Sequence, residues 1–179
     1  MKSKINSLFN SVIYRFGSVI VDPGDVQDWT GVEHVLLTHA HFDHIYGLNS
    51  LWEANQKIYV YTNQSGYNAL LDPKLNLSKY HGLPFTFNHL DNIVIVKDNE
   101  MVKFGEGLIA QAIFTPGHNA SCITWIVGKQ IFTGDAYIPG IKVVSNLPGA
   151  NKVKAAESID RILELSEGRI IYPGHMIRE

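Results

Sequence analysis

Five of the eight histidines lie in three short motifs, HAHFDH, TPGH and PGH. The first motif spans His39 to His44. In extended backbone, alternate residues point to the same side, so His39, His41 and Asp43 could face one point in space. His44 would open a helix, and the change of backbone direction turns it toward that point. Side chains of these types packed together are costly to bury unless a cation lies among them, and a divalent metal ion removes that cost. The alternative is a His-rich turn whose imidazoles hydrogen-bond one another.

Three further candidate ligands follow strand-like segments. His118 comes after LIAQAIFT, Asp135 ends QIFTGD, and His175 comes after RIIYP. In each case a glycine, which relaxes the backbone, immediately precedes the ligand-type side chain. Singly, each residue is more typical of a cap or a surface turn. Together with the first motif they form a set of seven nitrogen and oxygen donors.

Seven donors exceed what one tetrahedral zinc ion takes, which indicates two ions. The expected arrangement places His39, His41 and His118 on one ion, Asp43, His44 and His175 on the other, and Asp135 between them. The set contains no thiolate, so the site is harder than a structural zinc site, and zinc, iron or manganese would be accepted. Structural zinc sites are typically thiolate-rich and closed, so this composition favours a catalytic role.

The bulk composition is that of an ordinary globular protein. The 179 residues predict one domain over 1–179, with 45% hydrophobic and 18% charged residues. The net charge of −2 favours neither nucleic acid nor an anionic membrane. The lone cysteine, Cys122, cannot form an internal disulfide, and no apolar run approaches a membrane span. The N-terminus lacks a signal-peptide pattern, so we expect a cytoplasmic protein with no nucleic-acid or membrane partner. The oligomeric state is not readable from the sequence.

The order of elements predicts an α/β fold. Strands are expected at 11–16, 18–22, 32–39 and 57–62, and helices at 44–55 and 64–71. An irregular segment over 72–90 precedes a strongly β run from 92 to 135. A helix follows at 153–165, with Val153, Ala156, Ile159, Ile162 and Leu163 on its apolar side, and a final strand at 169–173. This order favours two mixed β-sheets with outer helices over a single doubly wound sheet.

The motif series HAHFDH, TPGH, TGD and PGH resembles the metallo-β-lactamase-fold hydrolase superfamily, and the resemblance extends from Asp22 to His175. It implies a four-layer αβ/βα sandwich with metals in a cleft at the edge of the sheets. The pattern is most similar to the glyoxalase II-like branch, because His44 follows Asp43 and the bridging position is Asp135. Zinc β-lactamases lack that bridging aspartate, and flavodiiron relatives carry glutamate at the position of His41. RNA-processing relatives carry a large inserted domain, for which this chain has no room.

The resemblance implies a metal-dependent hydrolase with two zinc-type ions, which activate water to attack an ester-type carbonyl. Asp43 and Asp135 would orient the water, and the substrate would be a small-molecule thiolester or lactone. Glyoxalase II binds glutathione with a C-terminal helical domain, which is expected to be absent because the chain ends four residues after His175. The alternatives are an iron-dependent persulfide dioxygenase with one iron, a metal-binding protein without activity, and a β-lactamase.

Other residues near the motifs have expected roles of lesser weight. In relatives the aspartate matching Asp22 supports a ligand histidine, and the alternative is an Asx turn before Pro23. Lys142 could meet a substrate anion, although a solvated lysine is the simpler interpretation. Substrate choice is expected to lie in the loops 72–90 and 136–152. Packing roles are expected for Tyr46, Tyr137 and Tyr172, and Cys122 should be buried and inert.

Overall fold

The structure, a computed structural model, describes residues 1–25 and 30–176. One sheet has six strands in the order β1-β2-β3-β4-β5-β6, and the other has five in the order β11-β10-β9-β8-β7. The first sheet contains β1 (Lys2–Ile5), β2 (Val12–Phe16), β3 (Val19–Val21), β4 (His34–Leu36), β5 (Tyr59–Thr62) and β6 (Ile93–Ile95). The second contains β7 (Met101–Lys103), β8 (Ile109–Phe114), β9 (Ile123–Val127), β10 (Gln130–Gly134) and β11 (Ile170–Pro173).

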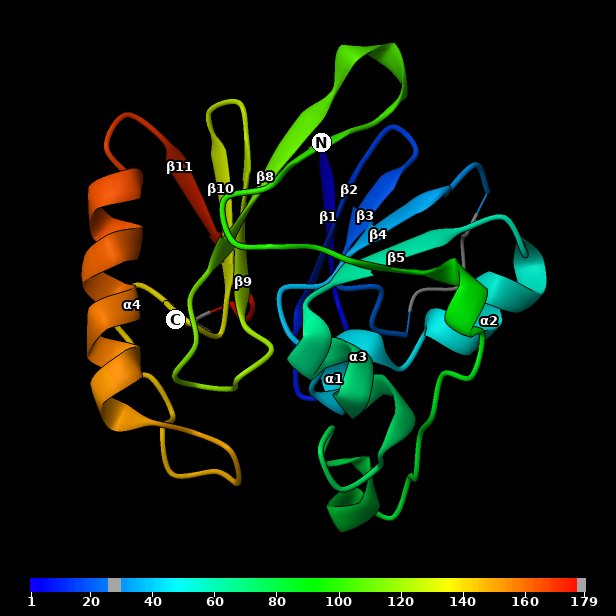
Figure 1. Ribbon diagram of the computed structural model, residues 1–179, viewed down its shortest axis with the longest axis horizontal. Coiled ribbons are helices and arrows are strands. Elements are labelled where there is room, and N and C mark those ends of the chain that lie inside the picture. The colour runs from blue at the N-terminus through cyan, green and yellow to red at the C-terminus, as the bar shows by residue number, and fades with distance from the viewer. Residues whose placement is uncertain (26–29, 177–179) are drawn as a thin grey trace.

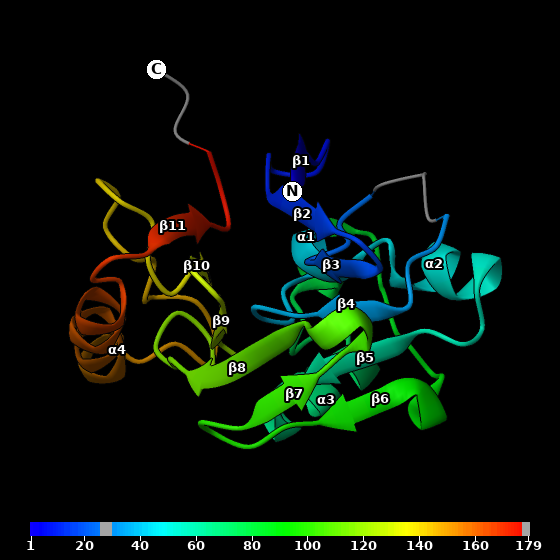
Figure 2. The same ribbon diagram turned by 90° about the horizontal axis from the view of Figure 1, so that it is seen from above.

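Helices cover the outer face of each sheet. The helices α1 (Phe42–Ile45), α2 (Leu48–Ala54) and α3 (Gln64–Leu71) lie on the six-stranded sheet, and α4 (Lys152–Leu165) lies on the other (Figures 1 and 2). Both sheets are mixed: β3 to β6 pair in parallel, as do β10 and β11, and the remaining pairs are antiparallel. The predicted four-layer architecture of two mixed sheets with outer helices is therefore confirmed. Among the residues described, no helix combines the length and apolarity needed to cross a bilayer.

Three layers of apolar side chains hold the sandwich together. Strand β2 shows how they arise, since Val12 and Tyr14 face the opposite sheet while Ile13 faces the helices. Trp125 is fully buried between the sheets, and its indole Nε1 donates a hydrogen bond to the Leu37 carbonyl at 2.8 Å. That bond fixes the chain just before the HAHFDH motif to the second sheet.

Two predicted elements differ most from the structure in their boundaries. The helix expected over 44–55 is two helices, because the chain turns at Tyr46 and Gly47 between α1 and α2. The strand expected over 32–39 is confined to His34–Leu36. Strand β1 was not predicted, because its four residues are all exposed and show no apolar alternation.

The predicted apolar side of α4 is wrong in part. Val153 is 69% exposed and Leu163 45%, whereas Ala155, Ser158 and Ile162 are buried. The reason is a close approach at the helix start, where a Cβ on Gly117 would lie 2.3 Å from the Ala155 backbone. Only small side chains fit between this part of the helix and the TPGH loop, and a count of apolar residues does not reveal that constraint.

Candidate metal centre

The sequence motifs meet at one end of the sandwich. The segment after β4 carries His39, and His118, Asp135 and His175 directly follow or come within a few residues of β8, β10 and β11. Strands β8, β10 and β11 run in the same direction within their sheet, so these residues emerge at the same edge. The structure thus brings all seven predicted ligand residues together, as the sequence predicts.

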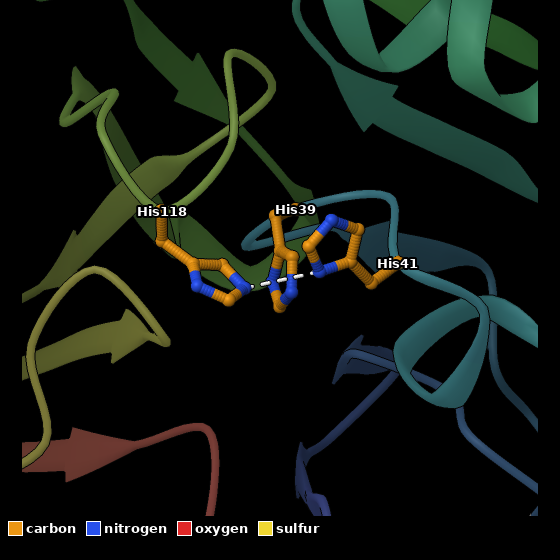
Figure 3. Close-up of side chains that lie close together, drawn as sticks. All are labelled: His39, His41 and His118. Atoms are coloured by element: carbon orange, nitrogen blue, oxygen red, sulfur yellow. Dashed lines mark hydrogen bonds between the residues drawn. The ribbon is translucent and has the colours of Figure 1, made fainter. Parts of the chain in front are cut away.

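Three of these residues form a buried trio. His118 Nε2 lies 3.0 Å from His41 Nδ1, and the His39 ring is centred 4.7 Å and 5.0 Å from the rings of His41 and His118 (Figure 3). All three are at most 5% exposed, and they offer ligand atoms within 4.8 Å of one another. His39 Nε2 is buried and has no hydrogen-bond partner among the residues described. An unpartnered buried imidazole nitrogen calls for a ligand.

The second trio comprises Asp43, His44 and His175. His44 Nε2 lies 3.3 Å from His175 Nε2, and Asp43 Oδ2 lies 3.4 Å from each of these nitrogens. Ligands about 2.0–2.1 Å from a tetrahedral ion are separated from one another by roughly 3.3 Å. The spacing of this trio therefore fits coordination of one ion, and the same holds for the His41–His118 pair.

Asp135 lies between the two trios. One carboxylate oxygen is 3.6 Å from His44 Nε2, and the other is 3.6 Å from His118 Nε2 and 3.4 Å from His175 Nε2. Gly174 provides the space for it, since a Cβ there would lie 2.3 Å from Asp135 Oδ1 and 3.0 Å from the His44 ring. The PGH motif thus has glycine at this position because any larger residue would collide with Asp135 and His44.

Asp43 reaches the centre by a different path from the one that the sequence predicts. The motif predicts that Asp43 shares an extended segment with His39 and His41, but Asp43 lies in the one-turn helix α1. His41 is the extended residue immediately before that helix, with φ −74° and ψ 148°. Because the helix begins at Phe42, Asp43 and His44 both turn toward His175. The candidate ligands therefore still converge, although the backbone at Asp43 is helical and not extended.

Asp22 holds the His44 side of the centre in place. Its Oδ2 lies 3.0 Å from His44 Nδ1, and its Oδ1 accepts the Thr38 backbone N–H at 2.7 Å. Asp22 therefore supports His44, as the sequence predicts for one of the candidate ligands, and the alternative of a local turn at Pro23 is wrong. Such a partner fixes the ring and leaves Nε2 for the ion.

Three other histidines have partners that the sequence did not indicate. The His118 Nδ1 donates to the Val144 carbonyl at 2.8 Å, and the His175 Nδ1 to the Phe9 carbonyl at 3.0 Å. The Asn119 amide lies 2.9 Å from His41 Nε2. Two of the partners are backbone carbonyls, which any residue type supplies, so no sequence motif could reveal them.

The turn between β1 and β2 holds the second trio. Asn6 Nδ2 donates to the Asp43 carbonyl at 2.6 Å, and Ser11 Oγ donates to the same carbonyl at 2.9 Å. Both side chains are 1% exposed. Between them, Phe9 has a left-handed φ of 53° and presents its carbonyl to His175. No sequence motif indicates this turn, because its residues lie far from the motifs along the chain.

Electrostatics prepare the first trio to bind a cation. Burial, reinforced by neighbouring histidines, lowers the pKa of His39 well below its usual value. Burial and His118 lower the pKa of His41 to about 3. Both rings are consequently neutral at pH 7, the form that coordinates metals.

The second trio carries the opposite polarity. Burial alone would lower the pKa of His44, but Asp43, Asp22 and Asp135 outweigh it and raise the pKa to about 10. Burial would likewise raise the pKa of Asp135, but the hydrogen bond with His175 and the nearby histidines lower it. Burial raises the pKa of Asp43. His44 is therefore protonated at pH 7, and an ion that binds in this trio would displace the proton from its Nε2.

The remaining candidates surround the centre. Lys142 is exposed and lines a small pocket of about 30 Å³ together with His118, Asp135 and apolar residues of the loop 136–152. Cys122 is buried as expected, and burial raises the pKa of its thiol. Three tyrosines pack against apolar clusters, as predicted: Tyr46, Tyr137 and Tyr172.

Comparison with known proteins defines the class of this fold and site. Residues 17–175 match the family described as the metallo-beta-lactamase superfamily. A probable metallo-hydrolase of Bacillus subtilis, YqgX, is 33% identical over 145 residues, which cover 79% of this chain and 67% of that protein. This chain belongs to the metallo-β-lactamase superfamily.

Other relatives are more distant. A probable polyketide biosynthesis zinc-dependent hydrolase of Bacillus subtilis, PksB, is 27% identical, with 79% of this chain and 55% of that protein covered. Glyoxalase II-like relatives are also present: a hydroxyacylglutathione hydrolase of Psychromonas ingrahamii is 23% identical over 88% of this chain and 56% of its own length. This chain thus spans about half to two thirds of these relatives.

The fold is shared with solved structures over nearly its whole length. The crystal structure of TTHA1623 in a di-iron-bound form superposes with a TM-score of 0.83, covering 99% of this chain and 93% of that chain. At 24% sequence identity the likeness establishes the fold alone.

Proposed function

We propose that this protein is a metal-dependent hydrolase that uses two zinc-type ions to cleave an ester-type bond in a thiolester or a lactone. The observation that carries the proposal is the placement of Asp135 within 3.6 Å of histidines from both trios. A carboxylate in that position can join two ions into one centre. His39, His41 and His118 would hold one ion, and Asp43, His44 and His175 the other.

The donor set suits hydrolysis. Divalent ions bound there would make a water molecule acidic enough to act as a nucleophile and would polarise the carbonyl under attack. The carboxylates of Asp43 and Asp135 would accept hydrogen bonds from such a water and orient it. Asp22 keeps the His44 ring from rotating. His175 and Asp135 are the more exposed members, with side chains 21% and 16% exposed, so the substrate approaches from their side.

The choice of ester-type substrates rests on the likeness to glyoxalase II-like proteins. The bridging position held by Asp135 and the adjacent pair Asp43-His44 support that branch. Hydroxyacylglutathione hydrolases are thiolesterases by their name, and they are among the relatives of this chain. Zinc is favoured by the nitrogen-rich donors, and the same donors also accept iron or manganese.

A substrate panel tests the proposal. Purified protein loaded with Zn²⁺, Fe²⁺ or Mn²⁺ is assayed against short-chain thiolesters, lactones and a chromogenic β-lactam. We expect metal-dependent release of thiol or hydroxy acid. Oxygen consumption with a persulfide by a protein holding a single iron would instead identify a dioxygenase, and tight metal binding with no turnover of any substrate would identify a binding protein.

The turn that holds Asp43 gives a second prediction. Replacing Asn6 with alanine removes one of two hydrogen bonds to the Asp43 carbonyl, so Asp43 and His175 become less well placed. We expect the second ion to bind about 10–100-fold more weakly, with the first ion retained. Metal content after dialysis against graded free zinc measures both affinities.

The matched control is Asn92→Ala. Like Asn6, Asn92 donates two hydrogen bonds from its amide, in this case to the carbonyls of Gln56 and Ile58, but it lies away from the centre. That variant should keep both ions. Equal loss of metal from the two variants would show that the turn at Asn6 contributes only general stability.

A further inference from the structure

A second pocket opens beside the metal centre. Its volume is about 220 Å³, and it lies between α3 and the two loops that the sequence analysis associates with substrate choice. Ser65 and Asn68 of α3 form one wall, Lys74 comes from the loop 72–90, and Pro148 and Gly149 come from the loop 136–152. The ends of both loops lie on the same side of the molecule as α3 (Figure 1). A volume below that of a typical small-molecule site suits one part of a substrate.

Asn119 joins this pocket to the centre. It lines the pocket, and its side-chain amide lies 2.9 Å from the Nε2 of the ligand histidine His41. Its carboxamide oxygen is already used, since it accepts hydrogen bonds from the Ser121 N–H and hydroxyl. Asn119 therefore borders both the pocket and the first trio, which places the pocket one side chain away from the proposed metal centre.

The polar groups of the pocket are chiefly donors. Lys74 is the one ionisable side chain among the lining residues, and it is exposed and makes no recorded ion pair in the described part of the chain. The Asn68 oxygen accepts a hydrogen bond from Gln64 at 3.1 Å, which leaves the Asn68 N–H groups for a ligand. The neighbouring Asp72 accepts the Lys74 backbone N–H and does not line the pocket.

We propose that this pocket binds a carboxylate carried by the substrate, with Lys74 as the residue that selects it. The inference rests on the proposed function for its catalytic meaning, but the pocket can be tested without turnover. A lysine and an asparagine with unpaired amide N–H groups among the residues that line one small space favour an anion over a neutral group. The substrate class is therefore an acidic thiolester or lactone.

Matched substrates test the kinetic consequence. One pair of thiolesters has 3-mercaptopropionate or 3-mercaptopropionamide as the leaving thiol, and a second pair has a succinyl or succinamoyl acyl group. We expect the acid of at least one pair to have a KM about tenfold below that of its amide, and Lys74→Met to abolish this preference. In Lys74→Met the kcat and the metal content should not change, and Lys74→Glu should bind the amide better than the acid.

The control is Lys79→Met, which removes an exposed lysine of the same loop that does not line the pocket.

Binding of unreactive probes separates the two proposals. The probes are 3-(methylthio)propionate and its amide. Their binding is measured by NMR, as chemical-shift changes of the backbone amides in α3 and at residues 119 and 120. We expect shifts with the acid only, lost in Lys74→Met and kept in Lys79→Met. Binding of the acid without hydrolysis of any thiolester would refute the proposed hydrolase function but support the carboxylate-binding pocket. Hydrolysis with no preference for the acid and no effect of Lys74→Met would refute the carboxylate-binding pocket but support the hydrolase function.

Discussion

Replacing Asp135 with asparagine is expected to lower hydrolysis at least about 100-fold, because even residues that only support metal ligands contribute about 10–100-fold. Asp135 contacts His44 at 3.6 Å, His118 at 3.6 Å and His175 at 3.4 Å. Asparagine has the same shape, but it is neutral and offers a single oxygen. The variant therefore loses the charge between the trios without leaving a cavity. Steady-state kinetics and metal content on the same sample measure the effect.

The control is Asp160→Asn, which changes an exposed aspartate on α4 and should leave turnover and metal content unchanged. Far-UV circular dichroism and thermal unfolding should show that Asp135→Asn retains the fold. If Asp135→Asn turns over substrate at the rate of the unaltered protein, a bridging role for this carboxylate is excluded.

Removal of metal by a chelator is expected to abolish turnover and to lower the melting temperature by about 5–10 °C for each ion removed. An ion that binds only the folded state, at about 100 times its dissociation constant, adds about 2.7 kcal/mol of stability. For a chain of this size each kcal/mol corresponds to roughly 2–4 °C. Without the ion, the buried His39 Nε2 remains unpaired and the buried carboxyl of Asp43 lies close to that of Asp135. Differential scanning calorimetry and an assay on the same sample measure both effects.

Addition of zinc to the metal-free protein should restore both the melting temperature and the turnover. Chelator already saturated with zinc serves as the control for direct effects of the chelator. Undiminished turnover in a sample shown to be metal-free would refute metal catalysis, whatever happens to the melting temperature.

The convergence of the seven candidate ligand residues could be predicted from the sequence because each residue is tied to a local signal. His39, His41, Asp43 and His44 are close together along the chain, so any compact path brings them near one another. The other three positions follow glycine at the ends of apolar strands, and strands that run in the same direction end at the same edge of a sheet. The two-sheet architecture could be predicted as well, because the order of apolar segments along the chain is also a local signal.

The supporting contacts could not be predicted, because they join residues that are distant along the chain or use backbone atoms. Asn6 and Asp43 are separated by 37 positions, and only the folded structure brings the turn between β1 and β2 against α1. The backbone carbonyls of Val144 and Phe9 cannot be recognised as histidine partners from the sequence, because every residue type has a backbone carbonyl. The buried face of α4 was misjudged because the proximity of Gly117 to Ala155 selects small side chains over apolar ones.

Anomalous diffraction from crystals of the metal-loaded protein, recorded at the absorption edges of zinc, iron and manganese, is the most direct measurement of the central claim. We expect two peaks in each chain, one among His39, His41 and His118 and one among Asp43, His44 and His175, with the Asp135 carboxylate in contact with both. A single peak, or two peaks that Asp135 does not join, would contradict a two-ion centre bridged by this residue.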